Sequence, residues 1–153
     1  MEIREINLDQ IEQIKQRMLD IFSGEPWNDR WTQEQLHCYI AELTGNTNSL
    51  SFGLYREDAL IGIALGRVKS WYEGREYWIE EFGILPELQQ KGFGSAFLNG
   101  IEEILAKKGI PYVALLTQRN FPAYHFYVKN GFEEQKETVF FVKKIGREGN
   151  PRN

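Results

Sequence analysis

Apolar side chains recur along the chain with two different periods, and each period predicts a different kind of element. In residues 8–21, 36–43 and 97–105 they recur at helical spacing, which predicts three amphipathic helices. Thr32, followed three residues later by Gln35, has the pattern of a capping box. This pair predicts that the second helix begins just after Thr32.

The segments between these helices predict strands and one more helix. The run 112–116 is almost entirely apolar, which predicts a strand buried on both faces. A short helix is expected over residues 121–129. The order of elements predicts one mixed α/β domain over residues 1–146, followed by a polar, disordered tail over 147–153. The other expected strands cover residues 1–6, 49–55, 59–68, 76–85, 132–134 and 138–144.

Composition narrows the classes of protein to consider. The chain has 153 residues and a formal net charge of −4, which argues against nucleic acid as a partner because such binding needs a basic face. No apolar run approaches the length that spans a membrane, and no signal-peptide pattern opens the chain. Cys38 is the only cysteine, so an intrachain disulfide is excluded and a cytoplasmic location is expected. His37 and His125 lack a metal-binding spacing, so we expect no metal.

A connection with two glycines follows the expected strand 76–85 and opens the third helix. Glycines there let the backbone approach a ligand closely, and the first amides of a helix have no partner within it. The helix dipole adds positive potential at the same end, so this connection predicts a phosphate site. Its residues are Gln89, Gln90, Lys91, Gly92, Phe93, Gly94 and Ser95.

Two motifs in this order give the chain a strong resemblance to the GNAT superfamily of N-acetyltransferases. The connection just described resembles the family's pyrophosphate loop, Q/R-x-x-G-x-G/A. Ala123-x-x-Phe126-Tyr127-x-x-x-Gly131-Phe132 resembles its second motif, A-x-x-F-Y-x-x-x-G-F. The resemblance covers nearly the whole chain. The loop Glu25-Pro26-Trp27-Asn28 and the paired glutamates resemble bacterial members that are aminoglycoside N-acetyltransferase-like. The resemblance implies an α/β (α+β) fold with a mixed, mostly antiparallel sheet, splayed in the middle and flanked by about four helices.

The resemblance also implies acetyl-CoA as the cofactor and a set of residues that bind it. Amides from Gln90 to Ser95 would hold the pyrophosphate, and the backbone of Phe82, Gly83 and Ile84 would pair with the pantetheine arm. Asn120 matches a position whose side-chain amide contacts the same arm. Family members are often dimers, which predicts a homodimer.

The implied chemistry is direct transfer of the acetyl group to a primary amine. Tyr127 matches the tyrosine that protonates the leaving thiolate, a task suited to a phenol with an ordinary pKa near 10. Glu80 and Glu81 are the candidate bases. Because adjacent strand residues point to opposite faces, only one of the two is expected to reach the acceptor, and Glu81 is slightly favoured.

The acceptor is predicted less directly than the cofactor. Glu25, Trp27, Trp71 and Tyr72 are candidate substrate-binding residues, although core packing explains the aromatic ones about as well. Acidic and aromatic groups suit a small cationic acceptor such as an aminoglycoside or a polyamine. Two alternatives stay open at this point. One is acetylation of a lysine or an N-terminal amine of a protein or peptide, and the other is a non-catalytic acyl-CoA-binding module.

Overall fold

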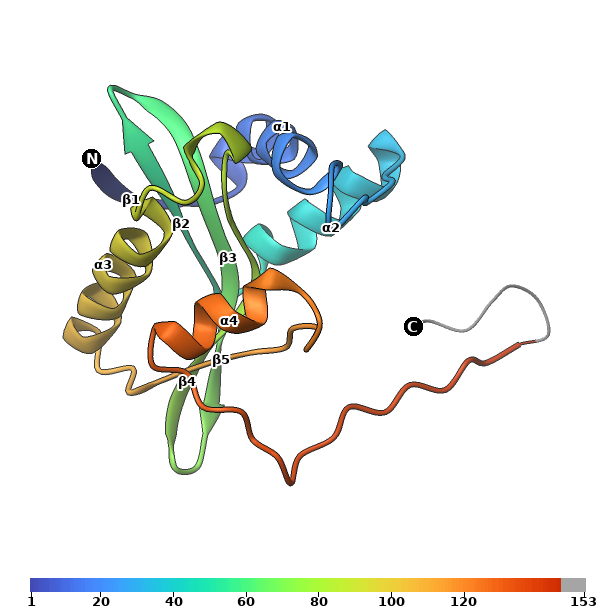
Figure 1. The fold of residues 1–153 in the computed structure, drawn as a ribbon, viewed down its shortest axis with the longest axis vertical. Helices are drawn as coiled ribbons and strands as arrows, with labels where there is room; N and C mark the ends of the chain where they lie inside the picture. Colours follow the sequence, from blue (N-terminus) through green and yellow to red (C-terminus); the bar gives the residue numbers. More distant parts are fainter. Residues whose placement is uncertain (147–153) are drawn as a thin grey trace. The chain divides into compact units, whose positions relative to one another are not determined.

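The computed structural model describes residues 1–146 (Figure 1). The chain divides into two compact units. The first unit is Met1–Thr117, and the second begins at Gln118. The disordered tail expected over 147–153 lies outside the described residues. The single domain expected over 1–146 stays a prediction.

The first unit is built on one sheet with the order β1-β2-β3-β4-β5. The strands β1 to β4 pair antiparallel in sequence order, and β5 pairs parallel with β4. The expected mixed, mostly antiparallel sheet is therefore confirmed. The strands are β1 (Glu2–Ile6), β2 (Ser49–Arg56), β3 (Ala59–Trp71), β4 (Gly74–Ile84) and β5 (Tyr112–Leu115).

The described residues form four α-helices, as expected. A single 3₁₀ turn precedes the first helix, and the second begins with the predicted capping box. The side-chain oxygen of Thr32 accepts a hydrogen bond from the backbone N–H of Gln35, and Gln35 Oε1 accepts one from the N–H of Thr32. The helices are α1 (Ile11–Phe22), α2 (Gln33–Gly45), α3 (Phe93–Lys107) and, in the second unit, α4 (Pro122–Lys129).

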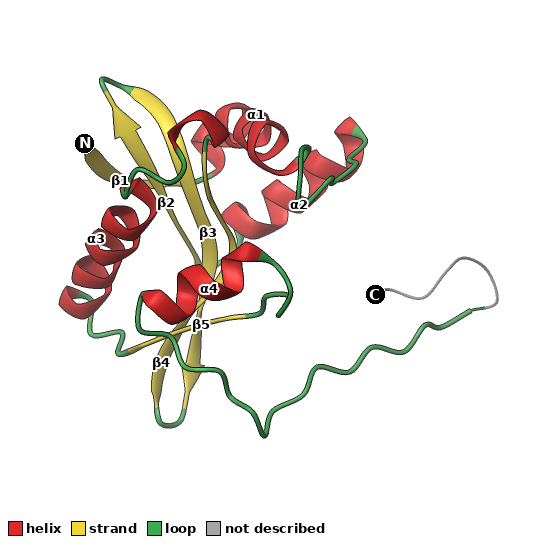
Figure 2. Cartoon of the chain, viewed as in Figure 1, coloured by secondary structure: helices red, strands yellow, loops and turns green. Residues whose placement is uncertain are grey.

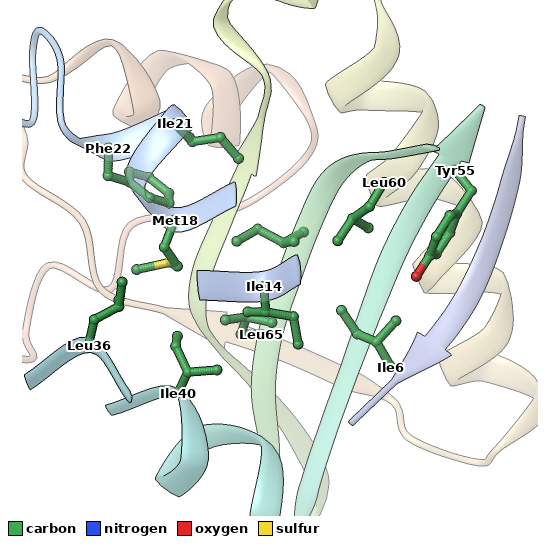
Figure 3. Close-up of a cluster of buried hydrophobic side chains, with 11 residues drawn as sticks. Ile6, Ile14, Met18, Ile21, Phe22, Leu36, Ile40, Tyr55, Leu60 and Leu65 are labelled. Carbon is green, nitrogen blue, oxygen red and sulfur yellow. The ribbon is translucent and has the colours of Figure 1, made fainter. Parts of the chain in front are cut away.

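Helices cover both faces of the sheet in the first unit. The face toward α1 and α2 carries the hydrophobic cluster shown in Figure 3, which includes Met18, Leu36 and Leu65. On the opposite face, α3 buries one apolar stripe, and its Phe97 stacks on Phe82 of β4 with ring centroids 5.4 Å apart. Burial of these stripes supplies most of the stability of the unit, because the hydrophobic effect scales with apolar area removed from water.

Three strand predictions from the sequence are wrong in whole or in part. Residues 132–134 and 138–144 form no strand and follow α4 as loop (Figure 2). β-branched and aromatic residues make a strand only where a neighbouring strand takes up the backbone hydrogen bonds, and none does so here among the described residues. The strand β5 is not buried on both faces, because it is the edge of the sheet and its Tyr112 is half exposed.

Candidate functional site

The second half of β4 has an open edge. On one side β4 pairs with β3 as far as Ile84, which lies opposite Gly62. On the other side it pairs with β5 only over Glu76 to Ile79. From Glu80 onward no described strand adjoins that second edge, so the splayed sheet that the sequence predicts is present. An open strand edge can pair with an extended ligand through backbone hydrogen bonds.

A β-bulge lies where the open edge begins. Leu65 of β3 is opposite Glu81, and the next residue, Gly66, is opposite Ile79, so Glu80 is an extra residue in β4. After the bulge, Phe82 faces α3, where it stacks on Phe97. Bulges of this kind bend a strand and redirect its side chains.

Both glutamates point to the α1–α2 face because of this bulge. The Glu80 carboxylate accepts a hydrogen bond from Arg67 Nε at 3.1 Å, and Arg67 shares the face of Leu65, a member of the α1–α2 cluster. The Glu81 carboxylate accepts a hydrogen bond from the Tyr39 hydroxyl of α2. The expectation that the two glutamates face opposite sides is therefore wrong, since strict alternation does not hold across a bulge.

The carboxyl of Glu81 is the most perturbed acid of the site. Its Oε2 atom lies 2.5 Å from the Tyr39 hydroxyl oxygen. The pKa of Glu81 is raised to about 7, mainly by burial; the hydrogen bond from Tyr39 lowers it, and the charges of Asp29 and Glu80 raise it. Burial, followed by the charge of Glu81, holds the pKa of Tyr39 well above its usual range. A carboxyl that titrates near neutral pH suits proton transfer at that pH.

Asp29 brings a third carboxyl to the same region. It lies in the loop between α1 and α2, and burial raises its pKa. Trp31 also stacks on Tyr39, with ring centroids 5.1 Å apart and ring planes 14° from parallel. Three carboxyls and a partly buried aromatic pair therefore gather between α2 and the bulge of β4.

The predicted substrate-binding residues do not gather in one place. Trp27 packs edge-on against Phe22 of α1 at 5.7 Å and lies in the α1–α2 loop, close in sequence to the exposed Glu25. Trp71 and Tyr72 lie at the tip of the β3–β4 hairpin. Trp71 is six residues along β3 from Leu65, a separation of about 20 Å at the rise of a strand. The hairpin tip is therefore remote from Glu81.

The connection after β4 has the backbone geometry that a phosphate site needs. Gln90 and Gly92 have positive φ angles of 61° and 87°, and α3 begins directly afterwards at Phe93. Gln89 Nε2 donates a hydrogen bond to the carbonyl oxygen of Ile84 at 3.0 Å, which ties the connection to the end of β4. The first amides of α3 point toward the start of the helix, where its dipole is positive.

The backbone is open to solvent in front of Gly92 at this helix start. A Cβ atom added to Gly92 would have no protein atom within 4 Å, so the surface in front of it is open. Arg56 lies near the same end, with its guanidinium 6.0 Å from the centre of the Phe93 ring. An open backbone surface, helix amides and a nearby cation fit a diphosphate group.

An open hollow lies where α1 meets the turn after β4. Its volume is about 460 Å³, and its lining includes Arg17 and Asp20 of α1 together with Leu85, Pro86 and Glu87. Arg17 and Asp20 form an ion pair within it. The hollow is on the α1–α2 face, because Leu85 packs against that cluster.

The second unit contains the other predicted catalytic residue, Tyr127, on α4. Gly131 ends this helix with a φ of 91°, which lets the N–H of Phe132 bond to the carbonyl of Tyr127 at 3.0 Å. The Phe132 ring then packs edge-on against Tyr127 at 5.3 Å. The spacing of the second motif thus fixes the tyrosine ring through the helix end. Asn120, predicted to contact the cofactor, is exposed in the turn before α4.

Sequence reasoning missed Tyr39 and Asp29 as members of the site, whereas Trp31 is one of the aromatic residues that it offers for an acceptor pocket. Tyr39 lies beside Ile40 on the apolar side of α2, so its position resembles that of an ordinary core aromatic. The bulge of β4 is visible in the sequence as a change in the alternation of apolar residues along the strand. Its buried apolar residues occupy odd positions, Tyr77 and Ile79, before the bulge, whereas Ile84 occupies an even position after it.

Two features are absent from residues 1–146, the part of the chain that the structure describes. Within this part of the chain, no helix has the length and apolar character needed to cross a membrane. The same residues contain no cluster of three or more His, Cys, Asp or Glu side chains arranged to hold a metal ion. The cytoplasmic location and the homodimer stay predictions from the sequence.

Comparison with known proteins links this geometry to one family. The acetyltransferase (GNAT) family matches residues 8–132. The tRNA(Met) cytidine acetyltransferase TmcA 2 of Saccharolobus solfataricus is 36% identical over 66 residues, which are 43% of this chain and 9% of that protein. The match therefore spans only a small part of that relative.

Solved structures agree with the fold. A possible acetyltransferase from Clostridium difficile 630 has a TM-score of 0.81 at 18% identity, covering 95% of this chain and 98% of that one. An aminoglycoside acetyltransferase from an uncultured soil metagenomic sample, in complex with sisomicin, has a TM-score of 0.74 at 17% identity, with coverage of 95% and 96%. AAC(6')-Iy, in complex with a bisubstrate analog, has a TM-score of 0.71 at 20% identity, with coverage of 94% and 98%. At these identities the likeness establishes the fold alone.

Proposed function

Because the chain belongs to the acetyltransferase (GNAT) family, which matches residues 8–132, we propose that it transfers an acetyl group from acetyl-CoA to a primary amine of a small cationic acceptor. One observation carries this proposal: Glu81 is a buried carboxyl with a pKa near 7, placed at the bulge where the open edge of β4 begins. A base poised near the working pH, beside a strand edge that can accept a ligand, suits acyl transfer to an amine.

The residues of the first unit would bind the cofactor in two places. The backbone of Phe82, Gly83 and Ile84 lies on the open edge of β4 and would pair with the pantetheine arm. The connection from Gln89 to Ser95, including Lys91 and Gly94, would hold the diphosphate through the first amides of α3. Acetyl-CoA would supply the acetyl group as a thioester.

Glu81 would act as the base for the acceptor. An acceptor ammonium is protonated at neutral pH, so it must lose a proton before its nitrogen can attack. The Glu81 carboxylate would take that proton, and the N–H of Ile84 would stabilise negative charge that develops on the carbonyl oxygen. The C–N bond then forms, the C–S bond breaks, and the hydroxyl of Tyr127 is proposed to supply the proton that the departing sulfur takes up.

The charge around Glu81 favours a cationic acceptor. Asp29 and Glu80 both act on the Glu81 carboxyl, and the chain has a net charge of −4. A positive amine would relieve the mutual repulsion of these groups. The aminoglycoside acetyltransferases among the structural neighbours support the same class of acceptor. Trp27 and Glu25 of the α1–α2 loop remain the candidates for contacts with the rest of the acceptor.

The test is a thiol-release assay with acetyl-CoA and a panel of amines. The panel contains an aminoglycoside, a polyamine, a lysine peptide, a peptide with a free N-terminus and a cytidine-containing RNA. The proposal expects turnover with the first two and cofactor binding by calorimetry without any acceptor. Turnover confined to the peptides or the RNA would refute the proposed acceptor class. Cofactor binding without turnover across the panel would identify a non-catalytic module instead.

A further inference from the structure

Tyr39 is held firmly at the border of the core. It lies on α2 between the fully buried residues Leu36 and Ile40, and its own ring packs against the same cluster. The Trp31 ring stacks on the Tyr39 ring, almost parallel to it, with ring centroids 5.1 Å apart. An aromatic ring fixed on two sides leaves its hydroxyl little freedom, so the hydroxyl marks a defined point beside the bulge of β4.

The hydroxyl of Tyr39 controls one oxygen of the Glu81 carboxylate. Its O–H donates to Oε2 at 2.5 Å, which leaves Oε1 outside this hydrogen bond. The interaction joins residues 42 positions apart in sequence, across the layer between α2 and the sheet. We propose that Tyr39 is a positioning residue for the acyl-transfer reaction: it holds Oε2 so that Oε1 is the oxygen that takes the acceptor's proton. This inference rests on the proposed function.

The same hydrogen bond also affects the pH range in which the Glu81 carboxyl is ionised and can accept a proton. Burial, the charge of Asp29 in the α1–α2 loop and the charge of Glu80 on β4 all favour the protonated carboxyl. Arg67 of β3 partly offsets Glu80 through its ion pair. Against these effects, the Tyr39 hydroxyl stabilises the ionised form, because a hydrogen bond donated to a carboxylate is stronger than one to the neutral acid. Without the hydroxyl, Glu81 would ionise at a higher pH.

The experiment compares wild type with Tyr39→Phe, which keeps the ring and removes only the hydroxyl. The pH dependence of kcat/KM is measured with the best acceptor of the panel, and the Glu81 carboxyl is titrated by carbon NMR without acceptor. A rise of about one pKa unit would lower the ionised fraction at pH 7 from about one half to about one tenth, an about five-fold loss of kcat/KM. Near pH 9 Glu81 is ionised in both proteins, so the loss should shrink to the part that comes from lost positioning, and the affinity for CoA should not change.

Two controls separate positioning from a general effect on the fold. Tyr112→Phe removes a hydroxyl from an exposed residue of β5 and should leave the pH profile unchanged. The double variant Tyr39→Phe with Glu81→Gln should lose no more activity than Glu81→Gln alone, because the hydroxyl acts through the carboxylate. If Tyr39→Phe folds poorly, Trp31→Leu keeps the hydroxyl but frees the ring, and it should shift the profile in the same direction by less.

The outcomes distinguish this inference from the proposed function. An active wild type whose pH profile and Glu81 titration are unchanged in Tyr39→Phe would overturn the positioning role alone. A loss of activity in Tyr39→Phe that is equal at pH 7 and pH 9 would overturn the effect of the hydroxyl on the ionisation of Glu81. A wild type that turns over no amine overturns the proposed function, whatever the titration of Glu81 shows.

Discussion

Glu81→Gln should make the protein more stable above neutral pH while removing its proposed base. The carboxyl of Glu81 has a pKa of about 7 in the fold against an ordinary 4.5, because burial penalises its charge. Its pKa is raised, so between these two values the folded state binds more protons than the unfolded state. The free energy of unfolding must therefore fall as the pH rises through this window.

The size of the effect follows from the two pKa values. A raise from 4.5 to about 7 corresponds to about 3 kcal/mol of stability lost by pH 7 and above, relative to pH 4. Glutamine carries no charge at any of these pH values and can still accept the hydrogen bond from Tyr39. The difference in melting temperature, variant minus wild type, should therefore be about 6–12 °C larger at pH 8 than at pH 4 for a domain of this size.

Thermal unfolding followed by circular dichroism from pH 4 to pH 8 measures this difference. The cost of burying the glutamine amide does not depend on pH, so it would shift the melting temperature of the variant equally at every pH. The diagnostic quantity is therefore how the difference in melting temperature between the two proteins changes with pH. Glu103→Gln, at an exposed position of α3, controls for the loss of one negative charge. A gap between wild type and Glu81→Gln that does not widen with pH would refute the reasoning, because Glu81 would then not be a penalised buried acid.

The remaining predictions concern activity. Gly92→Val should abolish CoA binding measured by calorimetry, whereas Gly109→Val, which imposes a similar strain at a φ of 72°, should keep it; equal affinities would contradict the assignment of the loop. Tyr127→Phe should lower kcat by about 100-fold or more with little change in CoA affinity, and a loss confined to affinity would argue against a general acid. Glu80→Gln removes a like charge beside Glu81, so the acidic limb of the pH–rate profile should move to lower pH; an upward shift would be inconsistent with the repulsion described here.

Features that depend on neighbours in sequence were predictable. The capping box at Thr32 needs only the residue three positions later. The helix start after Gly92 and the helix end at Gly131 both need a glycine at positive φ, and each glycine stands where its motif places it. These local rules gave the helices and the glycine loop without any knowledge of the sheet.

Features that depend on partners across the fold were not predictable. The strand expected over 138–144 has the β-branched and aromatic residues typical of a strand, but composition cannot show whether a neighbouring strand is present. The common face of Glu80 and Glu81 comes from the register between β3 and β4, which no single segment contains. Tyr39 gains its role only because that register turns Glu81 toward α2.

The bulge of β4 also determines where this strand can vary in length. Two residues, Glu80 and Glu81, lie opposite one residue of β3. Loss of either one would restore a regular ladder, and all remaining side chains of β4 would keep their present face of the sheet. A deletion elsewhere in the ladder would exchange the inner and outer residues of half the strand. Natural relatives that differ by one residue in this strand should therefore differ at the glutamate pair, where an insertion or deletion alters the acidic groups and spares the core.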